Sequence, residues 1–204
     1  HCIRSKNYVN AIVASKHPSY QWLTMEEAVE HCTKGLSEWK WASNCKTNPD
    51  IVIACCGDTP TLEALAATTI LRDNLPNLKI RFINVVDLMK IGSDENHSHG
   101  LPDSEYNKLF TTNKPIFFVY HGYPTLIHEL TWSRKNRDIN VFGYREEGTI
   151  TTAFDVRVQN GIDRFNIVKT IIKKLNKKGE KELNLYKQMD SLLAKHNEYV
   201  RKYG

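Results

Sequence analysis

Four apolar segments divide the chain, and each of them ends at polar or turn-forming residues. They lie at residues 51–56, 78–86, 115–120 and 139–144. The first, IVIACC, is a continuous apolar run rich in β-branched residues, which is typical of a strand buried on both faces of a sheet. The second alternates apolar and polar residues in its first half. The pattern therefore predicts four strands.

Helical patterns stand between these strands. Thr24 and Glu27 have the spacing of a capping box, which predicts a helix that begins there and runs to about Trp39. After the turn at Gly57 and Asp58, we expect Thr59 to cap a second helix with Pro60 at its first position. In that helix, one face is apolar: Leu62, Leu65, Ala66, Thr69 and Ile70. Further helices are predicted at residues 104–110, 124–132, 161–175 and about 180–201.

Strands alternate with helices at short spacing along most of the chain. This pattern is typical of a mostly parallel sheet covered by helices, an α/β domain. Residues 8–15, YVNAIVAS, are predicted to form a strand or an extended arm. The chain begins at His1 with extended apolar sequence, so we expect it to be a piece of a longer protein. We divide it into an arm and helix over 1–45, which link to upstream domains, and an α/β domain over 46–204 with a final helix.

Composition narrows the class of protein. The chain has 204 residues, a formal net charge of +5 and 41% hydrophobic residues, as expected for one globular domain. Its basic residues form no dense cluster, and it has no 18-residue apolar window, so we expect neither a nucleic-acid partner nor a membrane partner. Five cysteines without CxxC spacing favour reduced thiols and a cytoplasmic location.

Cys55 and Cys56 are the first candidates for chemistry. They close a strand, so their side chains should face opposite sides of the sheet and pack as small hydrophobic groups. The following helix N-terminus could lower a thiol pKa and favour a nucleophile, but no motif supplies a base. The same turn resembles a phosphate-binding turn without its glycine pattern, and we expect Glu63 in the first helical turn to repel an anion.

Three further groups of polar residues are candidates for sites. His97 and His99 form an HxH pair in a polar loop, but a metal site needs more ligands than these. His121 follows a strand and His128 lies on the next helix. The sequence has no G-x-S-x-G nucleophile elbow, which would supply the nucleophile for a hydrolase that uses either histidine as its base. In the segment from Arg145 to Thr152, we expect Thr149, Thr151 and Thr152 to cap the next helical segment rather than to take part in acid–base catalysis. From its residues alone, the chain therefore predicts a fold and no complete catalytic set.

Long motifs carry a resemblance to a known family. They are DTPTLEALAA (58–67), LPNLKIRFINVVDLMKI (75–91), VYHGYPTLIHELTWSR (119–134) and FGYREEGTITTAFDVRVQNGIDRF (142–165). These segments resemble the C-terminal domain of phosphoketolase, and the similarity runs from about Ile12 to the final helix. The resemblance implies a three-layer α/β fold like the transketolase C-terminal domain, with a mostly parallel sheet of about five strands.

The resemblance also implies an activity for the whole enzyme, which is an aldehyde-lyase. The family uses thiamine diphosphate and Mg²⁺ to cleave xylulose 5-phosphate or fructose 6-phosphate beside its carbonyl, and inorganic phosphate then releases acetyl phosphate and an aldose phosphate. In the family, two preceding domains bind the pyrophosphate and the pyrimidine of the cofactor. This sequence lacks their GDG-type segment, so it is similar to the third domain alone. The resemblance thus implies an inactive fragment, with the upstream domains and a second subunit as its partners.

One residue is implied to reach substrate. Lys16, in Ser-Lys-His-Pro, matches a family lysine near the domain junction that is implicated in contacting substrate phosphate. Glu129 stands where other family members carry Arg, which argues against a phosphate role for its helix. No catalytic, cofactor-binding or metal-binding residue is expected in the chain.

The sequence is also compatible with two other hypotheses. One is a stand-alone regulatory module that binds a nucleotide or phosphorylated metabolite at the loops after Cys56, Tyr120 and Tyr144. The other is a self-contained hydrolase that uses Cys56 or His121.

Overall fold

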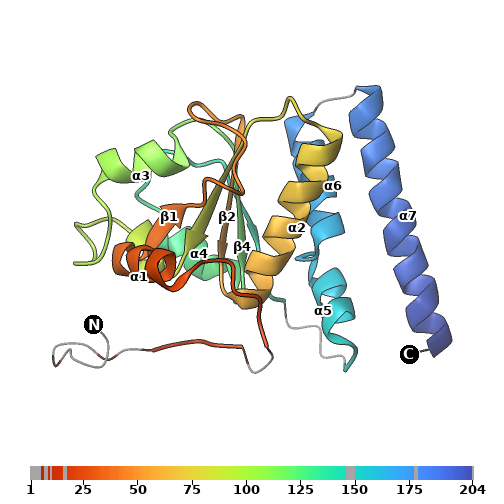
Figure 1. Ribbon diagram of the computed structural model, residues 1–204, viewed down its shortest axis with the longest axis horizontal. Coiled ribbons are helices and arrows are strands. Elements are labelled where there is room, and N and C mark those ends of the chain that lie inside the picture. The colour runs from red at the N-terminus through yellow and green to blue at the C-terminus, as the bar shows by residue number, and fades with distance from the viewer. Residues whose placement is uncertain are drawn as a thin grey trace.

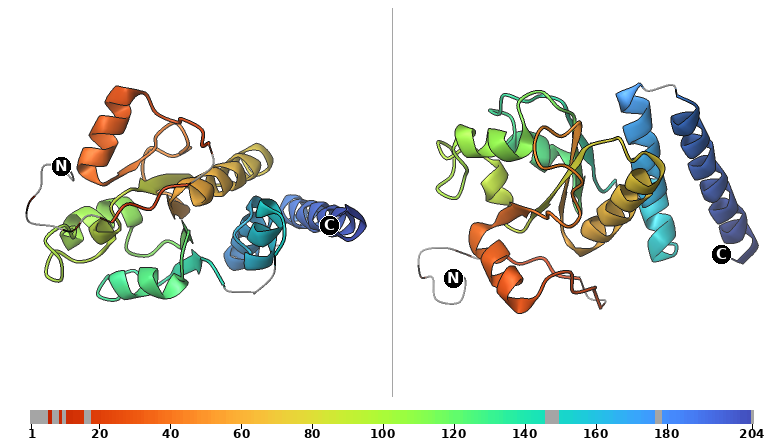
Figure 2. Two further views of the ribbon diagram at one scale, coloured as in Figure 1. Left: turned by 90° about the horizontal axis from the view of Figure 1, so that it is seen from below. Right: turned by 45° about the horizontal axis from the view of Figure 1, so that its top comes forward.

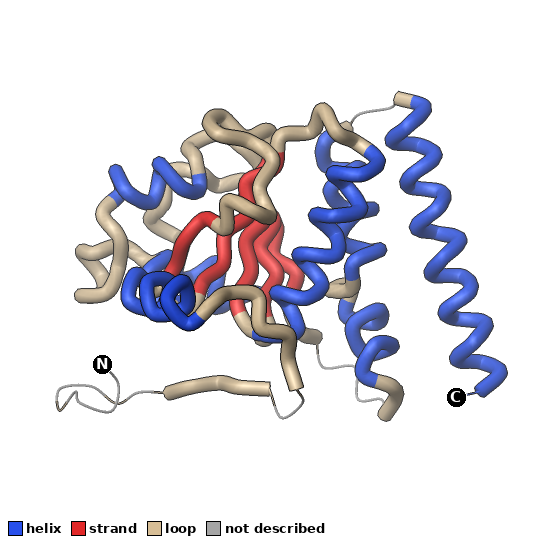
Figure 3. Tube along the Cα trace, viewed as in Figure 1, coloured by secondary structure: helices blue, strands red, loops and turns tan. Residues whose placement is uncertain are grey.

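Five strands form one central sheet with helices on both faces (Figure 1, Figure 3). The computed structural model describes residues 6, 9, 11–15, 18–145, 150–176 and 179–203. The strands are β1 (Leu36–Glu38), β2 (Ile51–Cys56), β3 (Ile80–Val85), β4 (Ile116–Tyr120) and β5 (Ile139–Phe142). Their order is β1-β3-β2-β4-β5, with β1 antiparallel to β3 and every other pair parallel. The predicted α/β fold with a mostly parallel five-stranded sheet is confirmed.

The apolar run in β2 is explained by its central place in the sheet. Its residues pair with β3 on one side and β4 on the other, and the first five are buried. Ile51, Ile53 and Cys55 belong to one core cluster, whereas Val52, Ala54 and Cys56 pack with the other. The side chains of Cys55 and Cys56 therefore face opposite sides of the sheet, as predicted.

Helices cover the two faces in separate layers (Figure 2). On one face lie α2 (Asp58–Asn74) and α6 (Arg164–Leu175), with α7 (Glu180–Tyr203) packed outside α6. On the other lie α3 (Asp103–Phe110), α4 (Pro124–Leu130) and the 3₁₀ helix η1 (Leu88–Ile91). The remaining helices are α1 (Met25–Lys34), beside β1, and α5 (Ala153–Asn160), which precedes α6. No helix in this described part of the chain is both long and apolar enough to span a membrane.

The first predicted helix is shorter than expected. The capping box is present, since Glu27 N donates to Thr24 Oγ1 and Thr24 N donates to Glu27 Oε2. However, the helix ends at Lys34 and not near Trp39, because Gly35 adopts a left-handed conformation with φ of 79°. The residues after Gly35 form β1 on the edge of the sheet.

The start of α2 also differs from the prediction. Its N-cap is Gly57, with φ of 102°, and not Thr59. Such a backbone favours glycine, because it has no Cβ. Pro60 is consequently the third helical residue and not the first. Farther along, Thr152 does cap α5, whereas the predicted capping residue Thr149 lies outside the described residues.

Stacked aromatic rings join the N-terminal segment to the core. The ring centroids of Tyr20 and Trp22 are 5.3 Å apart, and Trp22 stacks on Trp41 at 6.3 Å. Trp41 stacks on Trp39 at 5.3 Å, and Trp39 contacts Phe82 of β3 at 5.8 Å. Leu36, Trp39 and Ala42 thus belong to the core of the α/β domain, while the proposed division at residue 45 stays a prediction.

Candidate functional site at the carboxyl edge of the sheet

The loops that leave β2, β4 and β5 meet at one edge of the sheet. A Cβ atom on Gly57 would lie 3.4 Å from His121 Cβ, and Tyr144 N donates to Gly122 O at 2.8 Å. Gly143 must be glycine here, because an added Cβ would lie 2.6 Å from the oxygen of Gly122. In open α/β sheets, ligands favour this carboxyl edge, so it is the candidate site.

The N-terminal arm reaches the same edge. Ser15 N donates to Asp58 Oδ2 at 3.0 Å, and Asp58 is the first residue of α2. Figure 1 shows the arm running beneath this end of the molecule. Described arm residues 9 and 11–15 are exposed and form no strand. Lys16, the predicted phosphate ligand, follows Ser15 but lies outside the described residues.

Glu63 plays a different part from the one predicted. It lies in the second turn of α2 and is fully buried. Its carboxylate accepts hydrogen bonds from Arg157 at 2.7 Å and from Arg164 at 2.9 Å. Burial alone would raise the pKa of Glu63, but the two guanidinium groups hold it below its usual value. Glu63 therefore joins α2 to α5 and α6 as an ionised carboxylate whose charge is balanced by two guanidinium groups. The prediction that it repels an anion at the turn is wrong.

The two cysteines are unsuited to nucleophilic chemistry. Burial raises the pKa of Cys55 to about 11 and that of Cys56 to about 12. This cost of desolvating a thiolate outweighs the expected effect of the helix N-terminus. Both thiols are protonated near neutral pH, which removes the basis for a hydrolase that uses Cys56.

A chain of hydrogen bonds in the interior connects α1, β1 and β3 to the turn at Gly57, which lies at the carboxyl edge of the sheet. His31 Nδ1 lies 2.6 Å from Ser37 Oγ, and its Nε2 lies 2.8 Å from Asn84 Oδ1. Asn84 Nδ2 donates to Thr61 Oγ1, which donates to the Gly57 carbonyl. These bonds are all satisfied when the neutral ring carries its proton on Nε2. The sequence did not indicate this network, since its members come from four different elements and the turn before α2.

A second buried carboxylate, Asp155, binds the described residues just before α5. Asp155 accepts a hydrogen bond from Thr151 and lies 2.8 Å from His196 Nε2 of α7. Although burial would raise the pKa of Asp155, these hydrogen bonds hold it below its usual value. This contact connects the last helix to α5 and to Thr151 before it.

The two histidines of the HxH motif contact Asp87 and each other. His99 Nδ1 lies 2.8 Å from Asp87 Oδ2, and the rings of His97 and His99 meet edge to face. Within the described ranges, no three His, Cys, Asp or Glu side chains are grouped as ligands. His121 and His128 are both exposed, one in a loop and one on α4.

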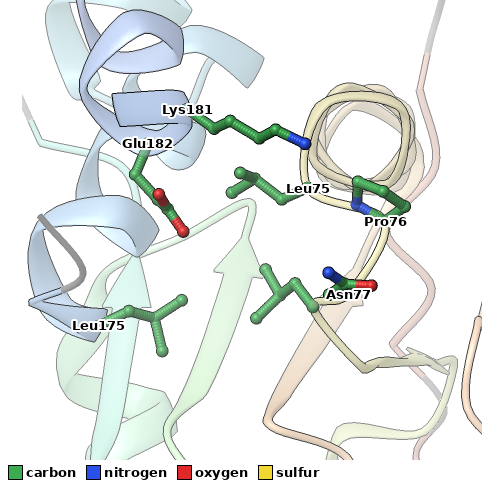
Figure 4. A pocket seen from close by; sticks show the side chains of 7 residues that line it. Leu75, Pro76, Asn77, Leu175, Lys181 and Glu182 are labelled. Atoms are coloured by element: carbon green, nitrogen blue, oxygen red, sulfur yellow. The ribbon is translucent and has the colours of Figure 1, made fainter. Parts of the chain in front are cut away.

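A small cavity lies away from this edge, between the ends of α2 and α6 and the start of α7 (Figure 4). Its volume is about 80 Å³. Its lining consists of Leu75, Pro76, Asn77, Leu78, Leu175, Lys181 and Glu182. Because small-molecule sites usually have about 300–1,000 Å³, this cavity is too small to be the candidate site.

Comparisons with known proteins cover the whole chain. The sequence model of the XFP C-terminal domain family matches residues 16–204. A probable phosphoketolase from Clostridium acetobutylicum is 54% identical over 204 residues, which cover 100% of this chain and 26% of that relative. Probable phosphoketolase 1 from Rhizobium meliloti is 52% identical over 206 residues, with the same shares covered. The chain thus spans about a quarter of the length of these curated relatives.

Solved structures support the fold. A transketolase from Pichia stipitis in complex with sedoheptulose 7-phosphate is 17% identical, with a TM-score of 0.50. The similar region covers 71% of this chain and 18% of the transketolase. At this identity the likeness concerns the fold alone. Since the family match extends over nearly the whole chain, the chain belongs to the XFP C-terminal domain family, the C-terminal domain of phosphoketolases.

Proposed function

We propose that this chain is the structural and interface domain of a thiamine-diphosphate-dependent phosphoketolase. The full-length enzyme converts a ketose phosphate, xylulose 5-phosphate or fructose 6-phosphate, and inorganic phosphate to acetyl phosphate and an aldose phosphate. The observation that carries this proposal is identity of about half with probable phosphoketolases over all 204 residues. In this proposal the protein is cytoplasmic and homo-oligomeric, and its partners are upstream domains of the same polypeptide.

The residues of this chain do not fit the cofactor. The sequence has no GDG-type segment followed by Asn, and the described residues offer no cluster of three metal-binding side chains. We therefore assign thiamine diphosphate and Mg²⁺ to the other three quarters of the enzyme, and no catalytic step to this chain.

Lys16 is the one residue that we propose to contact substrate, through its phosphate group. An ammonium group is a suitable point charge for phosphate. Its neighbour Ser15 lies against Asp58 at the carboxyl edge, where the loops of three parallel strands also meet. Lys16 would then act from the junction between this domain and the preceding one.

The activity is tested on the full-length protein. Xylulose 5-phosphate and inorganic phosphate should yield acetyl phosphate only when thiamine diphosphate and Mg²⁺ are present, and this chain alone should yield none. Lys16→Ala should lower kcat/KM for the ketose phosphate, whereas Lys46→Ala, at an exposed lysine, should leave it unchanged. A full-length protein that forms no acetyl phosphate from either ketose phosphate would contradict the proposal.

A further inference from the structure

Exposed apolar side chains gather at the carboxyl edge of the sheet. Val86 directly follows β3 and is 50% exposed, Tyr123 lies between β4 and α4 and is 53% exposed, and Ile150, after β5, is fully exposed. Strands β3, β2 and β4 are neighbours, and adjacent strands lie about 4.8 Å apart. The loops that carry Val86 and Tyr123 are therefore separated by about two strand spacings, roughly 10 Å.

The arm adds apolar residues to the same edge. Val9, Ile12 and Val13 are exposed by 100%, 78% and 88%, although each is an apolar β-branched residue. The hydrogen bond from Ser15 to Asp58 holds the C-terminal end of this segment at the N-terminus of α2. Together these six residues form what we call the carboxyl-edge patch: Val9, Ile12, Val13, Val86, Tyr123 and Ile150.

The fold of this domain gives no reason for the patch. Apolar side chains stabilise a fold when they are removed from water. The exposed side chains of the arm make no such contribution within this domain. Other exposed apolar residues lie along single helices, Met25 and Val29 on α1 and Leu183, Tyr199 and Tyr203 on α7. The patch differs from these because it combines loops that follow several strands with an extended segment. A group of exposed apolar residues at one edge is the usual sign of an interaction surface.

We propose that the carboxyl-edge patch is the docking surface for an apolar face of the domain that immediately precedes this one in the same polypeptide. This proposal rests on the proposed function, and it assigns the preceding domain as the partner that contacts the carboxyl edge. The matched family consists of C-terminal domains, and about three quarters of each relative lies outside the matched region. A preceding domain would enter through the arm, which already lies at this edge (Figure 1).

The covalent connection favours this occupant over a second copy of the chain. A short linker gives a tethered partner an effective concentration in the millimolar range, which a free copy does not reach. Asp58, His121 and Arg145 interrupt the apolar residues at the same edge, as polar groups do around the apolar centre of many interfaces. Docking here would also bring the segment next to Lys16 against the preceding domain.

Photo-crosslinking in the full-length protein tests the proposal. Benzoylphenylalanine replaces Tyr123 in one variant and Trp132, which is 73% exposed, in a matched control. A third variant carries it at Ile150, in case the Tyr123 replacement does not fold. Mixing isotopically labelled and unlabelled protein distinguishes crosslinks within one chain from crosslinks between chains, and mass spectrometry locates them.

We expect Tyr123 and Ile150 replacements to crosslink within the chain to the preceding domain, and the Trp132 control to lack that crosslink. Adding Val86→Asp to the Tyr123 variant should reduce the crosslink yield several-fold, since a carboxylate resists burial without a partner. Crosslinks only between chains, no crosslinks from the patch, or equal yields from the control would each overturn the proposal. Acetyl phosphate formation by the same preparations is measured separately, so loss of the proposed activity and loss of docking are told apart.

Discussion

At the scale of single residues, the cysteines differ mainly in their access to solvent. Cys55 is buried and has a pKa raised to about 11, whereas Cys32 on α1 is exposed. Iodoacetamide near neutral pH should therefore modify Cys32 in the folded protein and Cys55 only after denaturation, because alkylation requires an accessible thiolate. Mass spectrometry of peptides from native and denatured samples measures this. Equal labelling of Cys55 and Cys32 in the native protein would contradict it.

The buried carboxylate of Glu63 should matter for stability. Glu63→Gln removes the charge that Arg157 and Arg164 share, and breaking such a buried pair costs about 3 kcal/mol of unfolding free energy. Urea denaturation followed by circular dichroism measures the loss. Glu30→Gln is the control, because Glu30 pairs with Lys34 in solvent and its replacement should change little. Similar midpoints for the two variants would show that the Glu63 pair contributes little.

His31 should make stability depend on pH. Burial lowers the pKa of His31 below 6.5, so the folded protein binds fewer protons than the unfolded chain. Its contribution to stability is complete above pH 6.5, falls as the pH drops from there to the folded pKa, and then levels off. Urea midpoints at about pH 8 and about pH 5 should differ less in His31→Asn than in the unmodified protein. The same replacement at exposed His128 should not reduce this difference.

At the scale of elements, one arginine organises the loop between η1 and α3. Arg134 is fully buried and donates to the carbonyls of Ile91, Gly92 and Leu101. Its guanidinium also lies 4.2 Å from the centre of the Tyr106 ring. Arg134→Leu should remove the side-chain donor from all three carbonyls and cost about 3 kcal/mol, although the Gly92 carbonyl still accepts from Leu101 N. We expect faster hydrogen exchange over residues 92–101, whereas Lys135→Leu at an exposed position should leave exchange there unchanged.

The sequence predicted the elements with strong local patterns and missed those that depend on distant contacts. β2 and β4 were found within a residue, because their apolar runs record burial on both faces. The residues of β1 were assigned to a helix, because three residues are too few to show the alternation of apolar and polar side chains that marks a strand. Their pairing partner, β3, lies far along the chain. Gly35 was a signal that could have placed the end of that helix.

The candidate site was predicted only in outline. The rule for parallel sheets located the carboxyl edge, because it requires only the order of strands and helices. The partners of Glu63 could not be foreseen, as they lie 94 and 101 residues away along the chain. The role of Lys16 came from resemblance alone and stays a prediction.

At the scale of the whole molecule, the last helix is part of the main core. Met189 of α7 is 2% exposed and belongs to the same cluster as Ile53 and Phe117 of the sheet. Met189→Ala should therefore lower the stability of the whole domain by about 2–5 kcal/mol in one cooperative transition. Gln188→Ala, at an exposed neighbour, is the control in the same urea titration. Separate melting of α7 in the unmodified chain would show that it is not part of the cooperative unit.

The stack of aromatic rings determines what tryptophan emission can report. Of the four tryptophans, Trp22, Trp39 and Trp41 lie in that stack, and Trp132 stands apart in solvent. Excitation energy passes readily between rings separated by only a few ångströms, so the three stacked indoles should emit as one unit. The fluorescence of this domain would then follow the corner around α1 and β1 together with Trp132 after α4, and a change confined to α5 or α7 would leave the spectrum almost unaltered.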